Sequence, residues 1–292
     1  MNDFYPDIRS YLGKYAKLHI YGSLESTNDT AKAMPGAHHG TLIIADSQTA
    51  GRGRYGRSFF SPPGCGIYMS IVLKPERLRM GSLSLMTPAA AVAVCETIES
   101  IDAIEPIGGL APKVKWVNDV LIGDKKICGI LTEGVTGSDG ELERIIVGIG
   151  VNFTLPPGGF PPELAEFVGS LFSEQEPPIT RCWFAAGIYN RLLARVETVH
   201  SCDHGCSSAF DQIDKNLHGQ GTASDLIGNS PQNIVIEYKK RLLMLGRRMS
   251  VIGSGATYEA VALDIDSNGG LIIQKDDGEI LTLSSGEISI RF

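Results

Sequence analysis

The stretch TLIIADSQTAGRGRYGRSFFSPPGCGIYMSIVL, residues 41–73, contains two apolar, β-branched runs separated by a basic, glycine-rich segment. TLIIAD (41–46) and GIYMSIVLKP (66–75) have the pattern of buried strands, and a proline ends the second one. The stretch therefore predicts two strands with the loop GRGRYGRS (51–58) between them.

Strand and helix patterns continue on both sides of that stretch. KLHIYG (17–22) predicts a strand, and SLESTNDTAKAM (23–34) predicts a helix with Ser or Thr as its N-cap. The alanine-rich residues from Ser84 to Ile101 predict a helix with an apolar face. VKWVNDVLIGDKKICGILTEG (114–134) predicts two short strands joined by a polar turn.

The second half of the chain changes character twice. GSDG (137–140) predicts a hairpin turn before a returning strand at 143–153. We expect a helix from Arg181 to His200, followed by a loop-like insertion at 201–232.

After Gly246, five short runs separated by Gly, Asn and Asp turns predict a small β-barrel; they are MSVIG, TYEAVALDID, GLIIQ, EILTL and EISIRF. The predicted domains are therefore residues 1–245, which contain the insertion at about 201–232, and the barrel of residues 246–292.

Composition restricts the class of protein. With 43% hydrophobic and 20% charged residues, the chain is an ordinary globular protein, and its net charge of −7 argues against a general nucleic-acid binder. The N-terminus lacks the apolar core of a signal peptide, and the apolar stretch from Leu83 to Cys95 is too short for a membrane span. Six cysteines without a CxxC pair fit reduced thiols. We therefore expect a cytoplasmic protein that does not enter a membrane.

The loop at 51–58 contains Arg52, Arg54 and Arg57 on a glycine-rich backbone. Glycines let backbone N–H groups approach an anion, and arginine is a bidentate donor to phosphate or carboxylate. The spacing resembles a nucleotide P-loop, but no helix follows, so that interpretation is rejected. An RNA-binding Arg-Gly segment is also rejected, because such segments are normally longer repeats in disordered tails and this one lies between two strands. A solvated surface loop remains an alternative, and so does nucleic-acid binding through residues 51–57, which predicts salt-dependent affinity.

Five motifs in register resemble the biotin–protein ligase family. They are Ser26-Thr27-Asn28, the loop from Gln48 to Arg57, Lys115-Trp116-Val117-Asn118-Asp119 followed by Lys126–Leu131, Gly148–Asn152, and Gly286–Ser289. The resemblance covers most of residues 17–153 and 235–292. It implies an α+β fold: a mixed β-sheet with packed helices, as in class II aminoacyl-tRNA synthetases and biotin ligases, plus a small C-terminal SH3-like β-barrel.

The resemblance implies an adenylate-forming ligase. Biotin reacts with ATP, with Mg²⁺, to give biotinyl-5'-AMP, and the biotin then passes to a lysine amine on a biotin carboxyl carrier domain. The first step joins two anions, whose repulsion at about 4 Å is roughly 4 kcal/mol at an effective dielectric near 20. Fixed cations are therefore required, and by resemblance the catalytic ones are Lys126, Arg54 and Lys115.

The resemblance also implies a set of binding residues. Arg52 and Arg54 belong to a loop that closes over biotin and the adenylate, and Lys126 binds the biotin carboxylate and the α-phosphate region. The complete expected set is Ser26, Thr27, Asn28, Gln48, Gly51, Arg52, Gly53, Arg54, Arg57, Phe59, Trp116, Asn118, Asp119, Lys126, Gly129 and Asn152.

Several of these roles have competing structural explanations. Ser26 and Thr27 suit the neutral ureido ring of biotin, but they equally suit helix capping. Asp119 is either a Mg²⁺ ligand or a turn residue that accepts local N–H groups. Lys126, without the resemblance, would be a solvated turn lysine. Asn152 is the adenine-contacting candidate, and Glu287 is a candidate for bringing the barrel onto the site.

The chain departs from the family pattern in two places. Val117 stands where the family usually has proline, and Phe59 where tryptophan is usual, so altered affinities are expected. The spacing of His200, Cys202, His204 and Cys206 fits no zinc site. About 16 residues precede the first predicted strand, too few for a DNA-binding domain, so no DNA binding is expected.

Other functions remain open. A lipoate–protein ligase shares the chemistry and fold, and a non-catalytic biotin-binding regulator would retain the pocket without turnover. An exposed sheet would permit a homodimer, by analogy alone.

Overall fold

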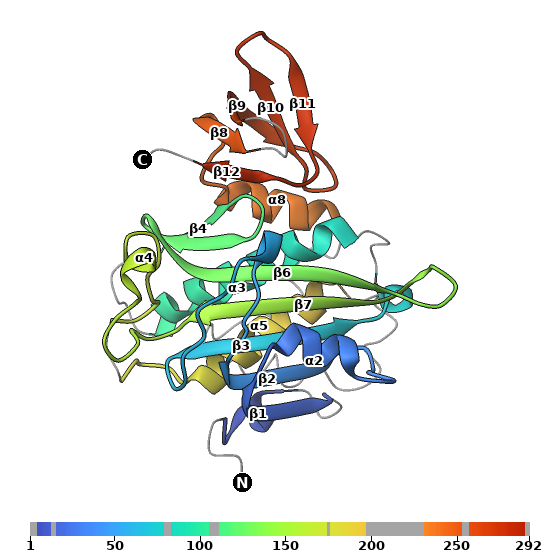
Figure 1. Ribbon diagram of the computed structural model, residues 1–292, viewed down its shortest axis with the longest axis vertical. Helices are drawn as coiled ribbons and strands as arrows, with labels where there is room; N and C mark the ends of the chain where they lie inside the picture. The colour runs from blue at the N-terminus through green and yellow to red at the C-terminus, as the bar shows by residue number, and fades with distance from the viewer. Residues whose placement is uncertain are drawn as a thin grey trace.

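The computed structural model describes residues 5–12, 16–78, 83–104, 111–173, 176–196, 231–252 and 257–289. Two β-sheets organise these residues: a large mixed sheet near the N-terminus and a smaller antiparallel sheet near the C-terminus, with a helix between them (Figure 1).

The large sheet has seven strands. In spatial order they are β1 (Leu18–Leu24), β2 (Thr41–Gln48), β3 (Gly66–Leu73), β7 (Leu142–Asn152), β6 (Lys125–Thr136), β5 (Asp119–Ile122) and β4 (Pro112–Lys115). The pair β1–β2 is parallel, and the other neighbours are antiparallel. The sheet is therefore mixed, as the sequence predicts.

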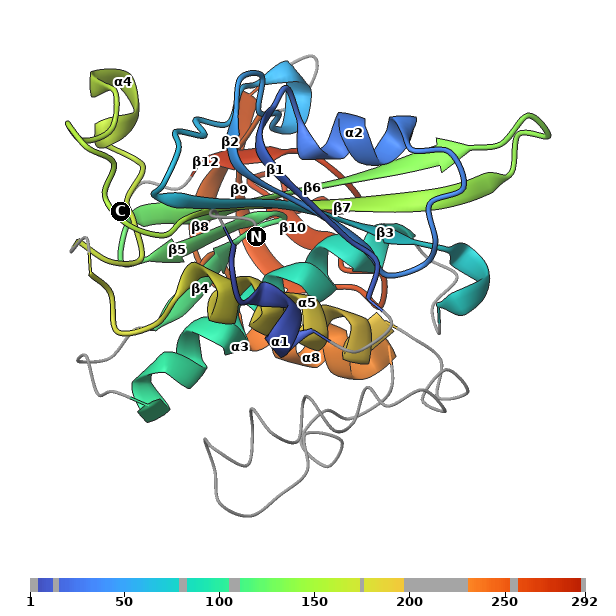
Figure 2. The ribbon, with the colours of Figure 1, turned by 90° about the horizontal axis from the view of Figure 1, so that it is seen from below.

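Helices cover the two faces of this sheet unequally. Helix α2 (Thr27–Ala33) lies on one face, and α1 (Ile8–Tyr11), α3 (Met86–Ile104), α5 (Arg181–Val196) and α8 (Pro231–Arg241) lie on the other (Figure 2). The remaining helical turns are α4 (Pro162–Ala165), η1 (Arg54–Gly56), η2 (Pro75–Arg77) and η3 (Leu83–Leu85). None of the helices in the described part of the chain has both the length and the apolar composition needed to cross a membrane.

The apolar runs of the sequence become the centre of the sheet. Every residue of β3 and the first six of β2 are buried, because helices or loops cover both faces of these strands. Alanines in α3 let α5 approach closely, and the two helices form the main core with the underside of the sheet. The predicted N-cap is also confirmed, since Ser26 Oγ accepts from the Asp29 N–H at the start of α2.

The C-terminal sheet has five strands. They are β8 (Arg248–Ile252), β9 (Thr257–Ile265), β10 (Leu271–Lys275), β11 (Ile280–Leu283) and β12 (Glu287–Ser289), paired in the order β11-β10-β9-β8-β12. The five predicted strands are thus confirmed, and so is the predicted α+β class with a small C-terminal β unit.

Two expectations require correction. Residues 114–134 lie in three strands rather than two, because the chain reverses at residues 116–118 and Lys115 pairs with Asp119. The turn Trp116-Val117-Asn118 contains neither glycine nor proline, so the sequence hides this reversal, and burial of the Trp116 ring stabilises it. The predicted insertion at 201–232 ends earlier, because α8 begins at Pro231. Residues 201–230 and the cluster His200, Cys202, His204 and Cys206 lie outside the described residues.

Candidate active site

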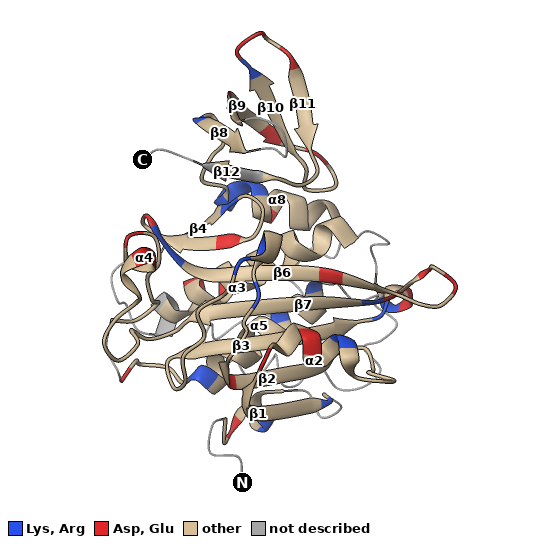
Figure 3. Ribbon diagram, viewed as in Figure 1, with Lys and Arg blue, Asp and Glu red and all other residues tan. Residues whose placement is uncertain are grey.

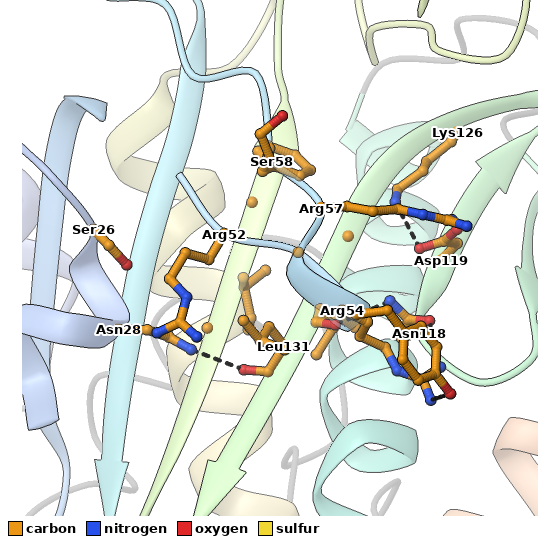
Figure 4. Close-up of a pocket in the computed structure, with 18 of the residues that line it drawn as sticks. Ser26, Asn28, Arg52, Arg54, Arg57, Ser58, Asn118, Asp119, Lys126 and Leu131 are labelled. Atoms are coloured by element: carbon orange, nitrogen blue, oxygen red, sulfur yellow. Dashed lines mark hydrogen bonds and ion pairs between the residues drawn. The ribbon is translucent and has the colours of Figure 1, made fainter. Parts of the chain in front are cut away.

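A cavity of about 150 Å³ lies on the α2 side of the large sheet, between β6, β7 and the glycine–arginine loop. The loop crosses in front of these strands; Arg52 is directed toward Asn28, Arg54 toward Asn118, and Arg57 toward Lys126 and Asp119 (Figure 4). The segment that the sequence marks as an anion-binding loop is therefore the cover of a cavity rather than an isolated surface loop.

Most of the residues expected to bind ligands line this cavity. They come from three regions that are distant in the chain: Ser26, Thr27, Asn28, Gln48, Arg52, Gly53, Arg54, Arg57, Phe59, Lys115, Trp116, Asn118, Asp119, Lys126 and Gly129. Their contacts with ligands stay predictions, but the tertiary structure brings them to one place.

Two members of the expected set do not line the cavity. Gly51 lies behind it, where a Cβ atom would come within 2.5 Å of the Phe59 carbonyl oxygen. Asn152 is buried, and its Nδ2 donates to the Gly169 carbonyl oxygen at 3.0 Å. By strand alternation Asn152 is on the same face of β7 as Gly148 and Gly150, beyond the end of the cavity.

The polar residues at the start of α2 form a closed hydrogen-bond network. The N–H and Oγ1 of Thr27 both donate to Gln48 Oε1, at 2.8 and 3.1 Å, and Gln48 Nε2 donates to Ser61 Oγ at 2.9 Å. Asn28 Nδ2 donates to the Leu131 carbonyl oxygen and to Glu133 Oε2, at 3.2 and 2.8 Å. Because the side chains hold each other, a ligand would meet polar groups whose orientation is already set.

Ser70 on β3 also belongs to that network, and it contacts Thr27 and Asn28 from the sheet. Its Oγ lies 2.8 Å from Thr27 Oγ1 and 2.6 Å from Asn28 Oδ1, and it is fully buried. Nothing in the sequence of β3 distinguishes Ser70 from a solvent-facing strand serine, so only the packing reveals its position.

A floor of glycines on β6 and β7 makes room for the side chains above it. A Cβ atom on Gly150 would lie 2.6 Å from Phe59 Cε1, and one on Gly129 would lie 3.0 Å from Phe59 Cε2. A Cβ atom on Gly148 would lie 2.2 Å from Asn28 Oδ1. These three glycines allow Phe59 and Asn28 to lie directly on the sheet.

Part of the cavity wall is formed by residues outside the set expected from the sequence. The additional lining residues are Tyr55, Ser58, Ile130, Leu131, Gly148, Ile149, Gly150, Gly286 and Ile288. Gly148 and Gly150 could have been found, because glycines alternating within a strand indicate one face approached closely by other atoms. Ile130 and Ile149 could not, because apolar strand residues are indistinguishable from core.

The cations of the cavity differ in their partners. Lys126 Nζ lies 2.7 Å from Asp119 Oδ1, an ion pair that lacks hydrogen-bond geometry, and 5.9 Å from the centre of the Phe59 ring. Arg52 is paired with the carboxylates of Asp29 and Glu133. Arg54 instead donates to Asn118 Oδ1 at 3.2 Å and lies against the Tyr55 ring. Among the described contacts, neither Arg54 nor Lys115 has a carboxylate partner.

The C-terminal sheet reaches the cavity through Trp116 and β12. The buried Trp116 ring donates from Nε1 to the Gly269 carbonyl oxygen at 3.0 Å, and Gly286 and Ile288 line the cavity. Glu287 was the residue expected to make this connection. Its side chain is not among those that the structure describes, and its neighbours Gly286 and Ile288 line the cavity.

The described residues contain no group of three or more His, Cys, Asp or Glu side chains placed to hold a metal ion. Asp119 is the single acidic residue among those lining the cavity. This donor set fits a Mg²⁺ ion whose remaining ligands are phosphate oxygens and water, and it does not fit a resident metal centre.

Comparison with known proteins identifies the fold and the family. The model of the biotin/lipoate A/B protein ligase family matches residues 22–152, and that of the biotin protein ligase C-terminal domain matches residues 244–291. The bifunctional ligase/repressor BirA of Bacillus subtilis is 32% identical over 269 residues, which are 91% of this chain and 72% of that protein. The chain belongs to the biotin protein ligase family.

Two further members cover nearly the whole chain. The biotin–[acetyl-CoA-carboxylase] ligase of Mycobacterium tuberculosis is 25% identical over 278 residues, 94% of this chain and 89% of that protein. The solved biotin protein ligase from Aquifex aeolicus, in complex with biotin and ATP, has a TM-score of 0.67 at 24% identity and covers 94% of this chain and 98% of that chain. The predicted fold is thereby confirmed over both β-sheets.

Proposed function

We propose that this chain is an ATP-dependent biotin–protein ligase, which forms biotinyl-5'-AMP and transfers the biotin to a lysine on an acceptor protein. The observation that carries the proposal is the cavity itself: cations from two motifs line it together with a glycine floor and a preset polar network, in a member of the biotin protein ligase family. The B. subtilis and M. tuberculosis relatives are both named as ligases.

The first half-reaction requires two anions to meet. We assign Arg54 and Lys115 as the first counter-charges, because no described carboxylate compensates either of them. Lys126 is held by Asp119 until a ligand carboxylate or phosphate replaces that partner, so its charge is positioned in advance. Such preorganised cations stabilise the charge of the transition state without reorganisation at the moment of reaction.

The biotin end of the cavity would use the network at the start of α2. A ureido ring needs both donors and acceptors, and Ser26, Thr27, Asn28 and Gln48 supply them from buried positions. Helix capping by Ser26 and ligand contact are compatible, since a hydroxyl oxygen accepts one bond and its proton remains available for another.

We assign Asp119 as the side chain that would help hold Mg²⁺ on the ATP phosphates. The ion, when bound, neutralises phosphate charge and orients the nucleotide. Asn152 is assigned as the adenine contact at the far end of β7, supported by its shared strand face with Gly148 and Gly150.

The transfer step needs no nucleophile from this chain. The acceptor amine attacks the anhydride carbonyl, the new C–N bond forms, the C–O bond to AMP breaks, and the ammonium proton is released. The chain has to exclude water from the anhydride, and the loop that covers the cavity is suited to this.

The acceptor we propose is a biotin carboxyl carrier domain, as the name of the M. tuberculosis relative suggests. We further propose that residues 1–245 contain the catalytic machinery and residues 246–292 form a separate C-terminal unit. A cytoplasmic location, a homodimer and the absence of DNA binding stay predictions of the sequence.

A lipoate–protein ligase is the second candidate, since the matched family includes both activities. The match of residues 244–291 to a biotin protein ligase C-terminal domain favours biotin. The deciding experiment measures pyrophosphate exchange with biotin or lipoate and then, by intact mass, labelling of a carrier domain. Biotin-dependent exchange and a biotin adduct on the carrier lysine are expected. Lipoate-dependent exchange, or biotin binding without exchange, would replace the proposal by the corresponding alternative.

A further inference from the structure

Arg52 lines the cavity, but its guanidinium is paired with carboxylates that do not. Its guanidinium donates to the Asp29 carboxylate on α2, and Nη2 lies 3.6 Å from Glu133 Oε1 on β6. Figure 3 shows an acidic position on α2 and another on β6, both to the right of the basic stretches of the loop. Asp29 and Glu133 do not line the cavity, so this pairing is separate from the ligand contacts assigned above.

The carboxylates are themselves held in position. Glu133 accepts from Asn28 Nδ2 at 2.8 Å and lies 2.6 Å from Lys32 Nζ, and Lys32 Nζ is 3.4 Å from Asp29 Oδ1. Two acids and two cations therefore form one network. The hydrogen bond that Arg52 donates to Asp29 and the nearby charge of Glu133 raise the pKa of Arg52, so the pairing stabilises the charged guanidinium.

The backbone of the loop is bonded mainly to itself. Gly53 N donates to the Arg57 carbonyl oxygen and Phe59 N to that of Gly51, which closes a narrow hairpin around η1. Such a hairpin can move as one body. The described contacts that fasten it include those of Arg52 with α2 and β6, of Arg54 with Asn118, and of Phe59 with the glycine floor.

We propose that Asp29, with Glu133, is a latch that seats the loop over the empty cavity and so sets how readily ligands enter and leave. The effect on ligand entry and release rests on the proposed function, but the latch itself requires no ligand. Asp29 is thus a positioning residue that acts through Arg52. With side chains 44% and 46% exposed, the Arg52–Asp29 pair is a weak tether that can open during each catalytic cycle.

Trypsin cleavage can measure how often the loop opens, because Arg54 and Arg57 are cleavage sites within it. When opening is fast relative to cleavage, the cleavage rate follows the open population. An exposed pair contributes up to about 1 kcal/mol. Asp29→Asn should therefore accelerate cleavage of the ligand-free full chain after Arg54 and Arg57 by roughly two- to fivefold.

Glu25→Gln is the matched control. Glu25 is exposed, precedes the same helix, and has no described side-chain partner, so this variant removes an equal charge without touching the latch. It should cleave like the wild type. In about 0.5 M NaCl the difference between Asp29→Asn and wild type should shrink, since exposed charges are screened.

A double-mutant cycle separates a latch from local unfolding. In an Arg52→Gln background, Asp29→Asn should add no further acceleration, because the pair is already lost. The latch is overturned if Asp29→Asn and Glu25→Gln cleave alike, or if the two substitutions are additive. Because trypsin needs neither biotin nor ATP, that result is independent of whether the chain ligates biotin.

The enzymatic consequence uses a second readout. Asp29→Asn should speed biotinyl-5'-AMP dissociation from the preloaded enzyme by a similar factor while the single-turnover rate of adenylate formation stays near wild type. A loss confined to the chemical step would assign Asp29 to the reaction rather than to the loop.

Discussion

Lys126 Nζ lies 2.7 Å from Asp119 Oδ1 across the β5–β6 pair, with the Phe59 ring 5.9 Å away. Phe59 rests on Gly129 and Gly150, so the aromatic ring, the lysine and the glycine floor form one packed unit. The position of the cation is consequently defined by the sheet before any ligand arrives, as an adenylating enzyme requires.

Replacing Lys126 tests the electrostatic role of that unit. Lys126→Gln keeps a polar side chain but removes the charge, so biotin-dependent pyrophosphate exchange should fall about 10²- to 10³-fold. Lys113→Gln removes an exposed lysine from β4, a strand adjoining the same site, and should leave exchange unchanged. Equal activity of the two variants would show that the Lys126 charge is not used.

Filling the glycine floor should disturb the loop anchor. In Gly150→Ala the new methyl would lie 2.6 Å from Phe59 Cε1, and overpacking of this kind costs about 1–3 kcal/mol. We expect a higher KM for biotin and a lower thermal midpoint. Adding Phe59→Leu removes the clashing ring atoms, so the double variant should regain part of the thermal stability. If Gly150→Ala behaves as wild type, Phe59 does not rest on this floor in solution.

The hydrogen bond from Trp116 to Gly269 connects the two sheets. Trp116→Phe keeps an aromatic ring but leaves the Gly269 carbonyl oxygen without its donor, which should lower the free energy of unfolding by about 1 kcal/mol. Urea unfolding measures this loss. Trp183→Phe, at the second tryptophan of the chain, breaks no described hydrogen bond and should lower it less. If Trp183→Phe lowers the free energy of unfolding more than Trp116→Phe does, the hydrogen bond to Gly269 is not the cause of the loss.

Buried thiols and phenols predict sensitivity to alkali. Burial raises the pKa of Cys95 and Cys128 above the usual range, and it does the same for Tyr68 and Tyr238. At alkaline pH these groups stay protonated in the folded chain but lose their protons in the unfolded chain. The free energy of unfolding is therefore unaffected by them below about pH 8, and it decreases as the pH rises through the pKa values that the groups have in the unfolded chain. The thermal midpoint should fall between about pH 8 and 10.5.

Cys95→Ala supplies the control for that decrease. It removes one thiol whose pKa is raised by burial, and the midpoint should therefore fall less steeply with pH than in the wild type. A midpoint that is constant up to about pH 10.5 would contradict the burial of these groups.

Local sequence patterns were sufficient to predict most elements and the composition of the loop. Strand alternation, the Ser26 cap and the turn at residues 137–140 depend on neighbours in the chain, and all were confirmed. The reversal at residues 116–118 is not predicted, because the Trp116 contact that stabilises it comes from the C-terminal sheet.

The order of motifs along the chain determined the family and hence the chemistry, because each motif is a short, local pattern of residues. Only the tertiary structure decided which charges compensate each other. Asn28 and Glu133 meet across 105 residues of sequence, and Arg52 is paired with two carboxylates because α2 and β6 lie side by side there. Partners at such separations are fixed by the packing of the sheet, which no local pattern specifies.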